Sequence, residues 1–331
     1  MNPSQASGPQ TSLASQAHAA SISDGRAERM ARWAWWTLSF VLFVILFGAV
    51  VRITGSGAGC GQHWPSCNGE IAHLPRTTKT LIEYTHRLTS GASLFPVLAL
   101  VFFAFRDFGK GHLLRKGALF SLVFLLIEAL IGAALVRLGL VENDASAARA
   151  IVMPLHLVNT SALTAALVLT AWASREPSPT LRLPRNREGW LLALGLVLVL
   201  AVSITGAVTA LGDTLYPVRS APTLAAGLAR DHQSGSHFLE QLRAVHPLLA
   251  LATGAFLLYV PFRIREGRSS ARLALGARAV LVCTLLQLFA GVANIWLSAP
   301  GFMQVLHLAL ANALWIALVW TWATHQTESL A

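Results

Sequence analysis

Four histidines stand inside stretches of sequence that are otherwise almost entirely apolar: His86, His156, His246 and His307. Ionisable side chains are costly in such surroundings, so those that occur there usually serve a function. Two facing helices can each give one imidazole to the iron of a planar macrocycle, while their apolar faces cover the ring. A structural zinc site would need four ligands, and few acids and no cysteine stand near these histidines in the sequence. The pattern therefore predicts two haem sites, each held by a pair of histidines.

Carboxyl groups accompany the histidines only in the first half of the chain. Glu83 stands three residues before His86, and residues three apart share a helix face, so both could point at one ligand. At the corresponding positions of the second half, Arg243 replaces Glu83 and Gln287 replaces Glu128. A carboxyl group beside a reactant can exchange protons with it. We interpret the difference as proton-coupled chemistry in the first half and storage or relay of electrons in the second.

These charged residues also have structural interpretations. Thr80-x-x-Glu83 matches a capping box at the start of a helix, and Glu128 could form a hydrogen bond between helices. Arg52, Arg87 and Arg243 are candidates to bind the propionates of a haem, because guanidinium pairs well with carboxylate. The alternative for each arginine is that it extends along the apolar surface to reach water.

The elements that must position these residues are long apolar helices. The chain has 331 residues, of which 54% are hydrophobic and 12% charged, whereas soluble domains carry about 25% charged residues. This excludes an ordinary soluble enzyme, a disordered protein and a disulfide-rich secreted scaffold. A helix needs about 20 apolar residues to cross a bilayer, and long apolar runs do not resemble the alternating strands of an outer-membrane barrel. We predict an all-α integral membrane protein with eight spans, at residues 33–53, 81–105, 118–138, 152–174, 190–210, 244–262, 277–297 and 303–323.

The basic residues predict the orientation of these spans. Most of the 25 Lys and Arg residues lie in the tail and in the loops on the side that both termini share. By the positive-inside rule both termini are cytoplasmic, in a bacterial-type inner membrane, and the four histidines lie toward the outer face. The net charge of +10 thus has an explanation in topology, and nucleic acid is excluded as a partner. The seven other histidines, in the tail, loops and chain end, are expected to be exposed to solvent.

Two halves of the chain repeat one pattern. Gly48-Ala49-Val50 corresponds to Gly206-Ala207-Val208, and each histidine of the first half has a counterpart in the second. We expect two four-helix bundles with the same topology, related by a pseudo-two-fold axis along the membrane normal. The predicted parts are a disordered cytoplasmic tail at 1–30, an N-terminal bundle with the substrate haem at 31–174, a cytoplasmic linker at 175–189, and a C-terminal bundle with haem b at 190–325.

The loop after the first span is rich in glycine and carries Cys60 and Cys67. On the outer side of a membrane disulfides persist, so a bridge is the simplest interpretation. Two alternatives remain: a labile, redox-active pair, or a weak metal site in which His63 is a third ligand. Cys283 lies within a span and is expected to be a buried packing residue.

The first half also resembles a known family. The run from Gly48 to Gly57, then Cys60, Trp64-Pro65 and Cys67, and then Glu83-x-x-His86-Arg87, is similar to the pattern of haem A synthases. With the later histidines the resemblance covers about residues 33–323.

This resemblance implies an oxidoreductase that converts the C8 methyl of haem O to a formyl group, for the assembly of cytochrome oxidase. His86 and His156 would hold the substrate haem, and His246 and His307 would ligate the iron of a haem b cofactor. Glu83 matches the acid implicated in catalysis. We expect two successive hydroxylations, with haem b relaying electrons.

The resemblance also implies partners and one limit. The expected partners are membrane lipid, an electron donor that the sequence does not identify, the enzyme that makes haem O, and oxidase assembly factors. The sequence leaves open whether the chain forms a homo-oligomer. Cys60 and Cys67 match the outer-loop pair of many members. The loop at about 211–243 lacks the second pair found in some relatives, so a relay between two such pairs is not expected here.

Two other classes share part of the pattern. A non-catalytic di-haem b-type cytochrome would have the four histidines but no need of acids in one half only. A transporter often has internal repeats, yet its polar sites lie at the middle of the membrane.

Overall fold

The computed structural model describes residues 9–176, 179–217, 224–266 and 270–328, and within these ranges the regular secondary structure is helical. A short 3-10 turn, Leu242–Ala244, links α8 to α9. The helices are α1 Pro9–Ile53, α2 Thr78–Ala92, α3 Leu94–Asp107, α4 Leu113–Arg137, α5 Ala147–Ala173, α6 Arg187–Leu215, α7 Leu224–Asp231, α8 Phe238–Gln241, α9 Val245–Glu266, α10 Ala271–Trp296 and α11 Gly301–Glu328.

Eight helical segments among the described residues are long and apolar enough to cross a membrane. This confirms the prediction of a multi-pass, all-α membrane protein. One span, Thr78–Asp107, consists of α2 and α3, which meet at Ser93. Pro96 follows three residues later, and its missing N–H and its ring interrupt helical hydrogen bonding, which accounts for the break. The four histidines of the spans lie on α2, α5, α9 and α11.

The first helix begins earlier than we expected. The tail at 1–30 was predicted to be disordered, but α1 begins at Pro9 and continues without a break into the first span. The sequence from residue 16 to 31 contains five alanines, and alanine favours helix. Residues 1–8 lie outside the described residues.

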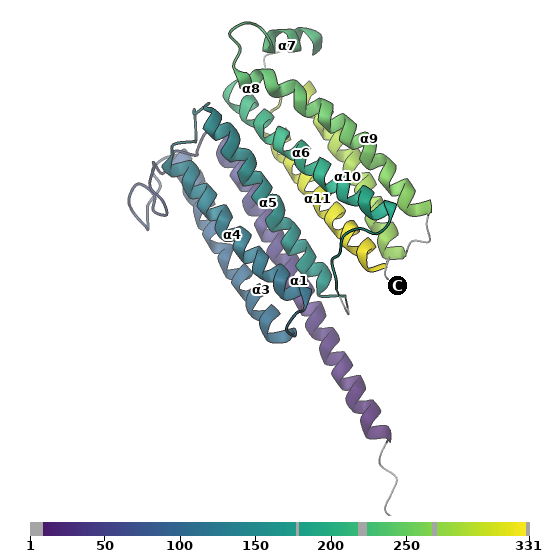
Figure 1. Cartoon of the computed structure of the whole chain (residues 1–331). Coiled ribbons are helices and arrows are strands. Elements are labelled where there is room, and N and C mark those ends of the chain that lie inside the picture. Colours follow the sequence, from purple (N-terminus) through teal and green to yellow (C-terminus); the bar gives the residue numbers. More distant parts are fainter. Residues whose placement is uncertain (1–8, 177–178, 218–223, 267–269, 329–331) are drawn as a thin grey trace, which may run out of the picture.

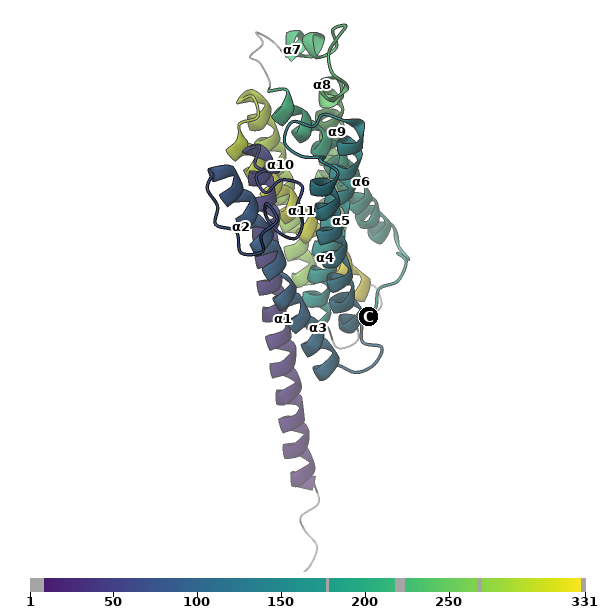
Figure 2. The same ribbon diagram turned by 90° about the vertical axis from the view of Figure 1, so that its left-hand side faces the viewer.

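The helices form two groups that lie side by side (Figure 1), with α1 to α5 in one group and α6 to α11 in the other. One apolar core surrounds Trp172 and Leu167 of α5, and a second surrounds Leu192 of α6 and Leu257 of α9. The start of α1 and the end of α11 lie at the same end of the bundle, and the loop after α1 lies toward the other (Figures 1 and 2). The pseudo-two-fold axis between the groups stays a prediction.

The two groups share a packing contact at corresponding places. A Cβ atom added at Gly117 of α4 would lie 2.5 Å from Oγ1 of Thr170 on α5. A Cβ atom at Gly276 of α10 would lie 2.5 Å from Oγ1 of Thr321 on α11. Small residues let membrane helices approach closely. The sequence therefore uses a glycine and a threonine to bring together the last two helices of each group.

The close contact at Gly117 predicts a loss of stability on substitution. In Gly117→Ala the added methyl group meets Thr170, whose side chain is fully buried and donates a hydrogen bond to the carbonyl of Ala166 at 2.7 Å. Overpacking of this kind costs about 1–3 kcal/mol, so the temperature of thermal unfolding in detergent should fall. Gly91→Ala is the control, because nothing lies within 4 Å of a Cβ atom there. An unchanged unfolding temperature for Gly117→Ala would contradict the described packing.

Candidate functional site

His86 stands against a glycine that leaves room for its ring. A Cβ atom at Gly48 of α1 would lie 3.2 Å from Cε1 of His86. The ring of Phe47 meets the imidazole edge to face at 5.7 Å between ring centres. Nδ1 of His86 is buried and has no hydrogen-bond partner among the described residues. His156 is an electrostatic neighbour of His86, so the structure brings the predicted first pair into one region.

His156 has a carboxylate beside it. Oε1 of Glu128 lies 3.5 Å from Nδ1 of His156. The same carboxylate accepts hydrogen bonds from Asn159 Nδ2, at 2.5 Å, and from the hydroxyl of Thr160. Both donors are on α5 and Glu128 is on α4, so the hydrogen bond between helices that we considered for Glu128 is present. It holds the acid next to the imidazole.

The second pair of histidines lies close together. The rings of His246 and His307 lie 6.3 Å apart at their centres and are perpendicular. Nδ1 of His246 lies 3.1 Å from the carbonyl oxygen of Val202. Nε2 of His307 lies 3.2 Å from Nε2 of Gln287. Gln287 is the residue that corresponds to Glu128 of the first half. The second pair therefore has neutral partners where the first has an acid.

Glycines lie against the second pair as well. A Cβ atom at Gly206 would lie 2.9 Å from Cε1 of His246, and one at Gly291 would lie 3.3 Å from Cε1 of His307. Ring nitrogens of His86, His156 and His307 are buried without a hydrogen-bond partner in the described part of the chain. These imidazoles are half-buried, lie against glycines on apolar helices, and have ring nitrogens that bind no protein group among the described residues. Such side chains fit the axial ligands of two haems.

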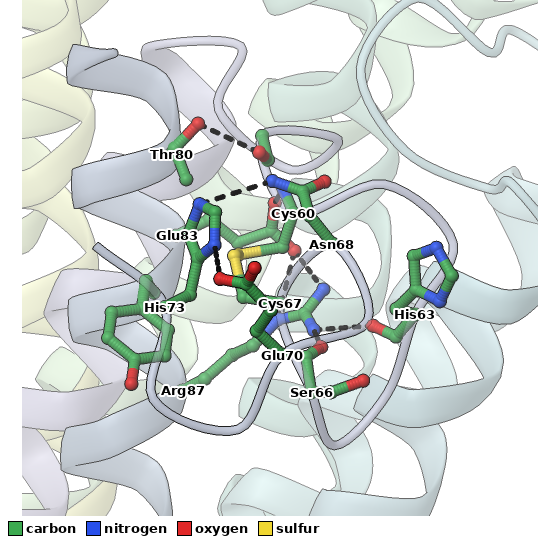
Figure 3. Close-up of a disulfide and its surroundings, with 12 residues drawn as sticks. Cys60, His63, Ser66, Cys67, Asn68, Glu70, His73, Thr80, Glu83 and Arg87 are labelled. Atoms are coloured by element: carbon green, nitrogen blue, oxygen red, sulfur yellow. Dashed lines mark hydrogen bonds and ion pairs between the residues drawn. A yellow bond between two sulfur atoms is a disulfide. The ribbon is translucent and has the colours of Figure 1, made fainter. Parts of the chain in front are cut away.

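Glu83 is engaged with the outer loop rather than with His86. Its side chain is buried, with 3% of its surface exposed. Oε2 accepts a hydrogen bond from the backbone amide of Cys60 at 2.7 Å, and Oε1 forms an ion pair with Arg87 (Figure 3). The capping box that we considered for Thr80 and Glu83 is wrong, because α2 begins earlier and its N-cap is Thr77.

The loop is fastened to α2 along its length. Cys60 and Cys67 form a disulfide and both are fully buried, which confirms the predicted bridge. Because both sulfur atoms are in this bridge, the alternative metal site with His63 as third ligand is wrong. Arg87 donates to the carbonyl oxygens of His63, at 2.5 Å, and Ser66, at 2.7 Å (Figure 3). The loop thus lies against α2 at Glu83 and Arg87, on either side of His86 in the sequence.

None of the three candidate arginines reaches outward to water as the alternative supposed. Arg52 of α1 donates to the carbonyl of Ala210 at 2.7 Å, to the hydroxyl of Thr214, and to Oε1 of Gln304 at 3.0 Å, and so connects the two groups of helices. Arg87 is bound to Glu83 and to the loop, as described above. Each guanidinium holds protein groups together.

In the second half, Arg243 stands at the position that corresponds to Glu83. It is buried, and it pairs with Asp213 at 2.9 Å and with Asp231 at 3.4 Å. These two acids were missed by sequence reasoning, because they lie at the end of α6 and in α7 and only the fold brings them to Arg243. Residues 218–223 of this loop lie outside the described residues.

Two further residues differ from expectation. His325 was expected to be exposed at the chain end, but α11 continues to Glu328 and His325 has 7% of its surface exposed. Arg149, which sequence reasoning passed over, is buried at the start of α5. Its place seven residues before His156 is the signal that could have identified it.

Comparisons with known proteins place the chain among membrane proteins of haem metabolism. Residues 31–319 match a family described as cytochrome oxidase assembly protein. The chain is 45% identical over 291 residues to a protein of Thermus thermophilus named protoheme IX farnesyltransferase, over 88% of this chain and 47% of that protein. It is 42% identical over 117 residues to a Heme A synthase of Bacillus licheniformis, over 35% of each. A Heme A synthase of Geobacillus kaustophilus is 44% identical over 99 residues, which cover 30% of this chain and 31% of that protein. The chain spans about half the length of the Thermus relative.

The fastening of the loop can be tested at Gly59. A Cβ atom there would lie 2.6 Å from the backbone oxygen of Lys79 and 2.8 Å from the nitrogen of Thr80. In Gly59→Ala the loop must therefore move away from α2, and Cys60 should lose its contact with Glu83. We expect faster proteolytic cleavage of the loop in membranes.

The control for this experiment is Ser66→Ala. The contact of Ser66 with Arg87 uses the backbone carbonyl, which the substitution keeps, so cleavage should stay at the parent rate. Equal cleavage rates for Gly59→Ala and the parent would contradict the described loop position.

Proposed function

The chain belongs to the cytochrome oxidase assembly protein family that its residues 31–319 match, and we propose that it is a haem A synthase, which oxidises the C8 methyl of haem O to a formyl group. The observation that carries this proposal is the difference between the two histidine pairs. At two corresponding positions the first half has the acids Glu83 and Glu128, while the second half has Arg243 and Gln287. The acids near Arg243, Asp213 and Asp231, are paired with its guanidinium. A protein that only carried electrons would not need this difference.

The proposed reaction proceeds in two hydroxylations of the same carbon. In each one, dioxygen supplies one oxygen atom that enters a C–H bond, while two electrons from the electron donor and two protons reduce the other oxygen atom to water, so the methyl group becomes an alcohol and then a gem-diol. Loss of water from the gem-diol leaves the formyl group. A carboxylate beside the carbon can accept the proton that leaves the C–H bond and return it to the oxygen that is reduced.

Glu83 is the residue to which we assign this role. Oε1 is paired with Arg87, and Oε2 accepts the backbone amide of Cys60. Oε2 is thus the atom at which Glu83 would take the proton. Because that atom is also the contact with the loop, protonation of Glu83 and the position of the loop would be coupled.

The first pair of histidines would hold the substrate. His86 comes from α2 and His156 from α5, and Gly48 leaves space beside the His86 ring. Glu128, 3.5 Å from Nδ1 of His156, would orient that imidazole so that Nε2 points at the iron of the substrate haem. Carboxylates commonly orient metal-binding histidines in this way.

The second pair would hold haem b. Haem b supplies a one-electron carrier within the membrane when it is bound. His246 can donate its Nδ1 proton to the carbonyl of Val202, which fixes the ring and leaves Nε2 as the ligand atom. His307 would be the ligand from α11, with Gln287 as its neutral neighbour.

We further propose that the haem sites lie toward the outer face of a bacterial-type inner membrane, with both termini cytoplasmic. The disulfide supports this orientation, since Cys60 and Cys67 are joined and disulfides persist outside the cytoplasm. The basic residues near the termini support it as well.

The proposed partners follow from the reaction. Haem O arises when a farnesyl group is added to protohaem, and the Thermus relative is named for that activity, with about half of its length outside the match. We propose that an enzyme of that class supplies the substrate. Oxidase assembly factors would receive haem A, and an electron donor would reduce haem b.

Replacement of Glu83 tests the assignment of function. We expect cells that make haem O and express Glu83→Ala to yield the protein with haem b but without haem A in the haem extract. Glu142→Gln is the control, because Glu142 is an acid of the neighbouring outer loop that pairs with Lys79 at 2.7 Å, and its haem A yield should equal that of the parent.

The haem extract of the parent decides between the classes of protein. Haem A supports the synthase, haem B alone supports the di-haem cytochrome, and the absence of haem supports a transporter. Normal haem A output from Glu83→Ala would contradict the role of that carboxylate.

The role of Glu128 can be tested separately. In Glu128→Gln the neutral amide can keep the bonds to α5 but no longer presents a negative charge to His156. Loss of such a partner typically lowers affinity or activity by roughly 10–100-fold, so haem A formation should fall by that order while the visible spectrum of haem b is unchanged. A changed haem b spectrum without a fall in haem A formation would contradict the assignment of Glu128 to the first haem site.

A further inference from the structure

Arg149 is a buried guanidinium that is only partly used. It is the third residue of α5, and 4% of its surface is exposed. Nη1 donates to the carbonyl oxygens of Glu142 and Asp144, both at 2.8 Å. Nε is buried and has no hydrogen-bond partner among the described residues. A buried charge that keeps a free donor is costly unless an anion meets it.

Arg52 adds a second positive charge in the same region, because it is an electrostatic neighbour of Arg149. The partners of Arg52 are a carbonyl, a hydroxyl and an amide oxygen, and none of these is charged. Within the described part of the chain, neither guanidinium has a direct ion pair.

The nearby acids are engaged elsewhere. Asp213, which attracts Arg52, is paired with Arg243 at 2.9 Å. Asp144 lies close enough to attract Arg149, but its side chain accepts hydrogen bonds from the amide and the hydroxyl of Ser146. Neither guanidinium therefore has a direct carboxylate partner among the described residues.

Helix geometry places this region above the first histidine pair. Arg149 and His156 are seven residues apart on α5, which is two turns, so they share a face of the helix. Arg52 and Gly48 are four residues apart on α1, and Gly48 is the residue against which His86 stands. Both arginines thus lie outward of the histidines, on the helices that carry or contact them.

We propose that Arg149 and Arg52 form the carboxylate-binding site for the propionates of the haem held by His86 and His156. This rests on the proposed function, and it names the part of the substrate that the protein recognises. The forked donors of a guanidinium match a carboxylate. The other candidates, Arg87 and Arg243, already pair with Glu83, Asp213 and Asp231. The second half lacks this feature, since Pro300 stands seven residues before His307.

The experiment measures haem binding rather than turnover. The full-length chain with His307→Ala, which removes one ligand of the second pair, is purified in detergent. It is titrated with protohaem and, separately, with protohaem dimethyl ester, whose propionates carry no charge. Binding is followed by the absorption of a bis-histidine haem. We expect the ester to bind roughly tenfold or more weakly than the diacid, because charge-assisted hydrogen bonds are lost.

Arg149→Gln in the same background identifies the residue. It should weaken binding of the diacid by roughly tenfold or more and leave binding of the ester unchanged. Arg149→Lys should recover part of the affinity for the diacid. Arg137→Gln is the matched control, because Arg137 is an exposed arginine at the outer end of the neighbouring helix α4, and its affinity for both haems should equal that of the parent.

Three results would overturn the proposal. Equal affinity of the parent for diacid and ester would show that propionates are not recognised, and this comparison needs no variant at Arg149. Equal weakening of both ligands by Arg149→Gln would show that Arg149 only supports the fold. Absence of bis-histidine binding in the parent would contradict the proposed first haem site itself, and with it this inference.

Discussion

A carboxylate inside a membrane helix must be neutralised by the protein, since lipid cannot do so. Glu83 meets this requirement with the guanidinium of Arg87, one turn further along α2, and with the amide of Cys60 from the outer loop. Arg87 in turn holds the carbonyls of His63 and Ser66. The position of the loop therefore depends on the charge of Glu83, and the loop lies over the helix that carries His86. Any chemistry at Glu83 takes place at the point where the loop is attached.

The second half meets the same requirement with the opposite charge. Arg243, at the position of Glu83, is neutralised by Asp213 and Asp231, and no cysteine stands in that loop. Both halves thus bind their outer loop through the residue three positions before the first histidine. Only the first half does so with an acid. The two halves therefore share a structural task at this position, although the residue that performs it has the opposite charge.

Much of the fold could be predicted from the sequence, because hydrophobic length alone determines where a chain can cross a membrane. The eight spans and the disulfide follow from local patterns. The partners of Arg52 could not be predicted, because Ala210, Thr214 and Gln304 are far away in the sequence and meet it only when the two groups of helices pack. The contact of Glu83 with the loop was missed for a related reason: helix periodicity indicates a shared face with His86, but it does not tell which neighbour covers that face. The start of α1 differed from the prediction, because apolar length identifies only the residues that cross the membrane. Residues of high helix propensity extend the helix into the tail before the span.

The contact between Arg52 and Ala210 has a consequence for the symmetry of the two halves. By the alignment of Gly48 with Gly206, position 52 of the first copy corresponds to position 210 of the second, so Arg52 binds the backbone of its own counterpart. In a dimer of identical subunits, contacts between equivalent residues occur at the two-fold axis. Two identical subunits would therefore bring two arginines together at this point, where like charges repel. A single chain avoids the repulsion, because only one of the two positions carries the arginine and the other is a small residue whose carbonyl accepts the hydrogen bond. Arg52 therefore joins the two halves through a contact that two identical halves could not form.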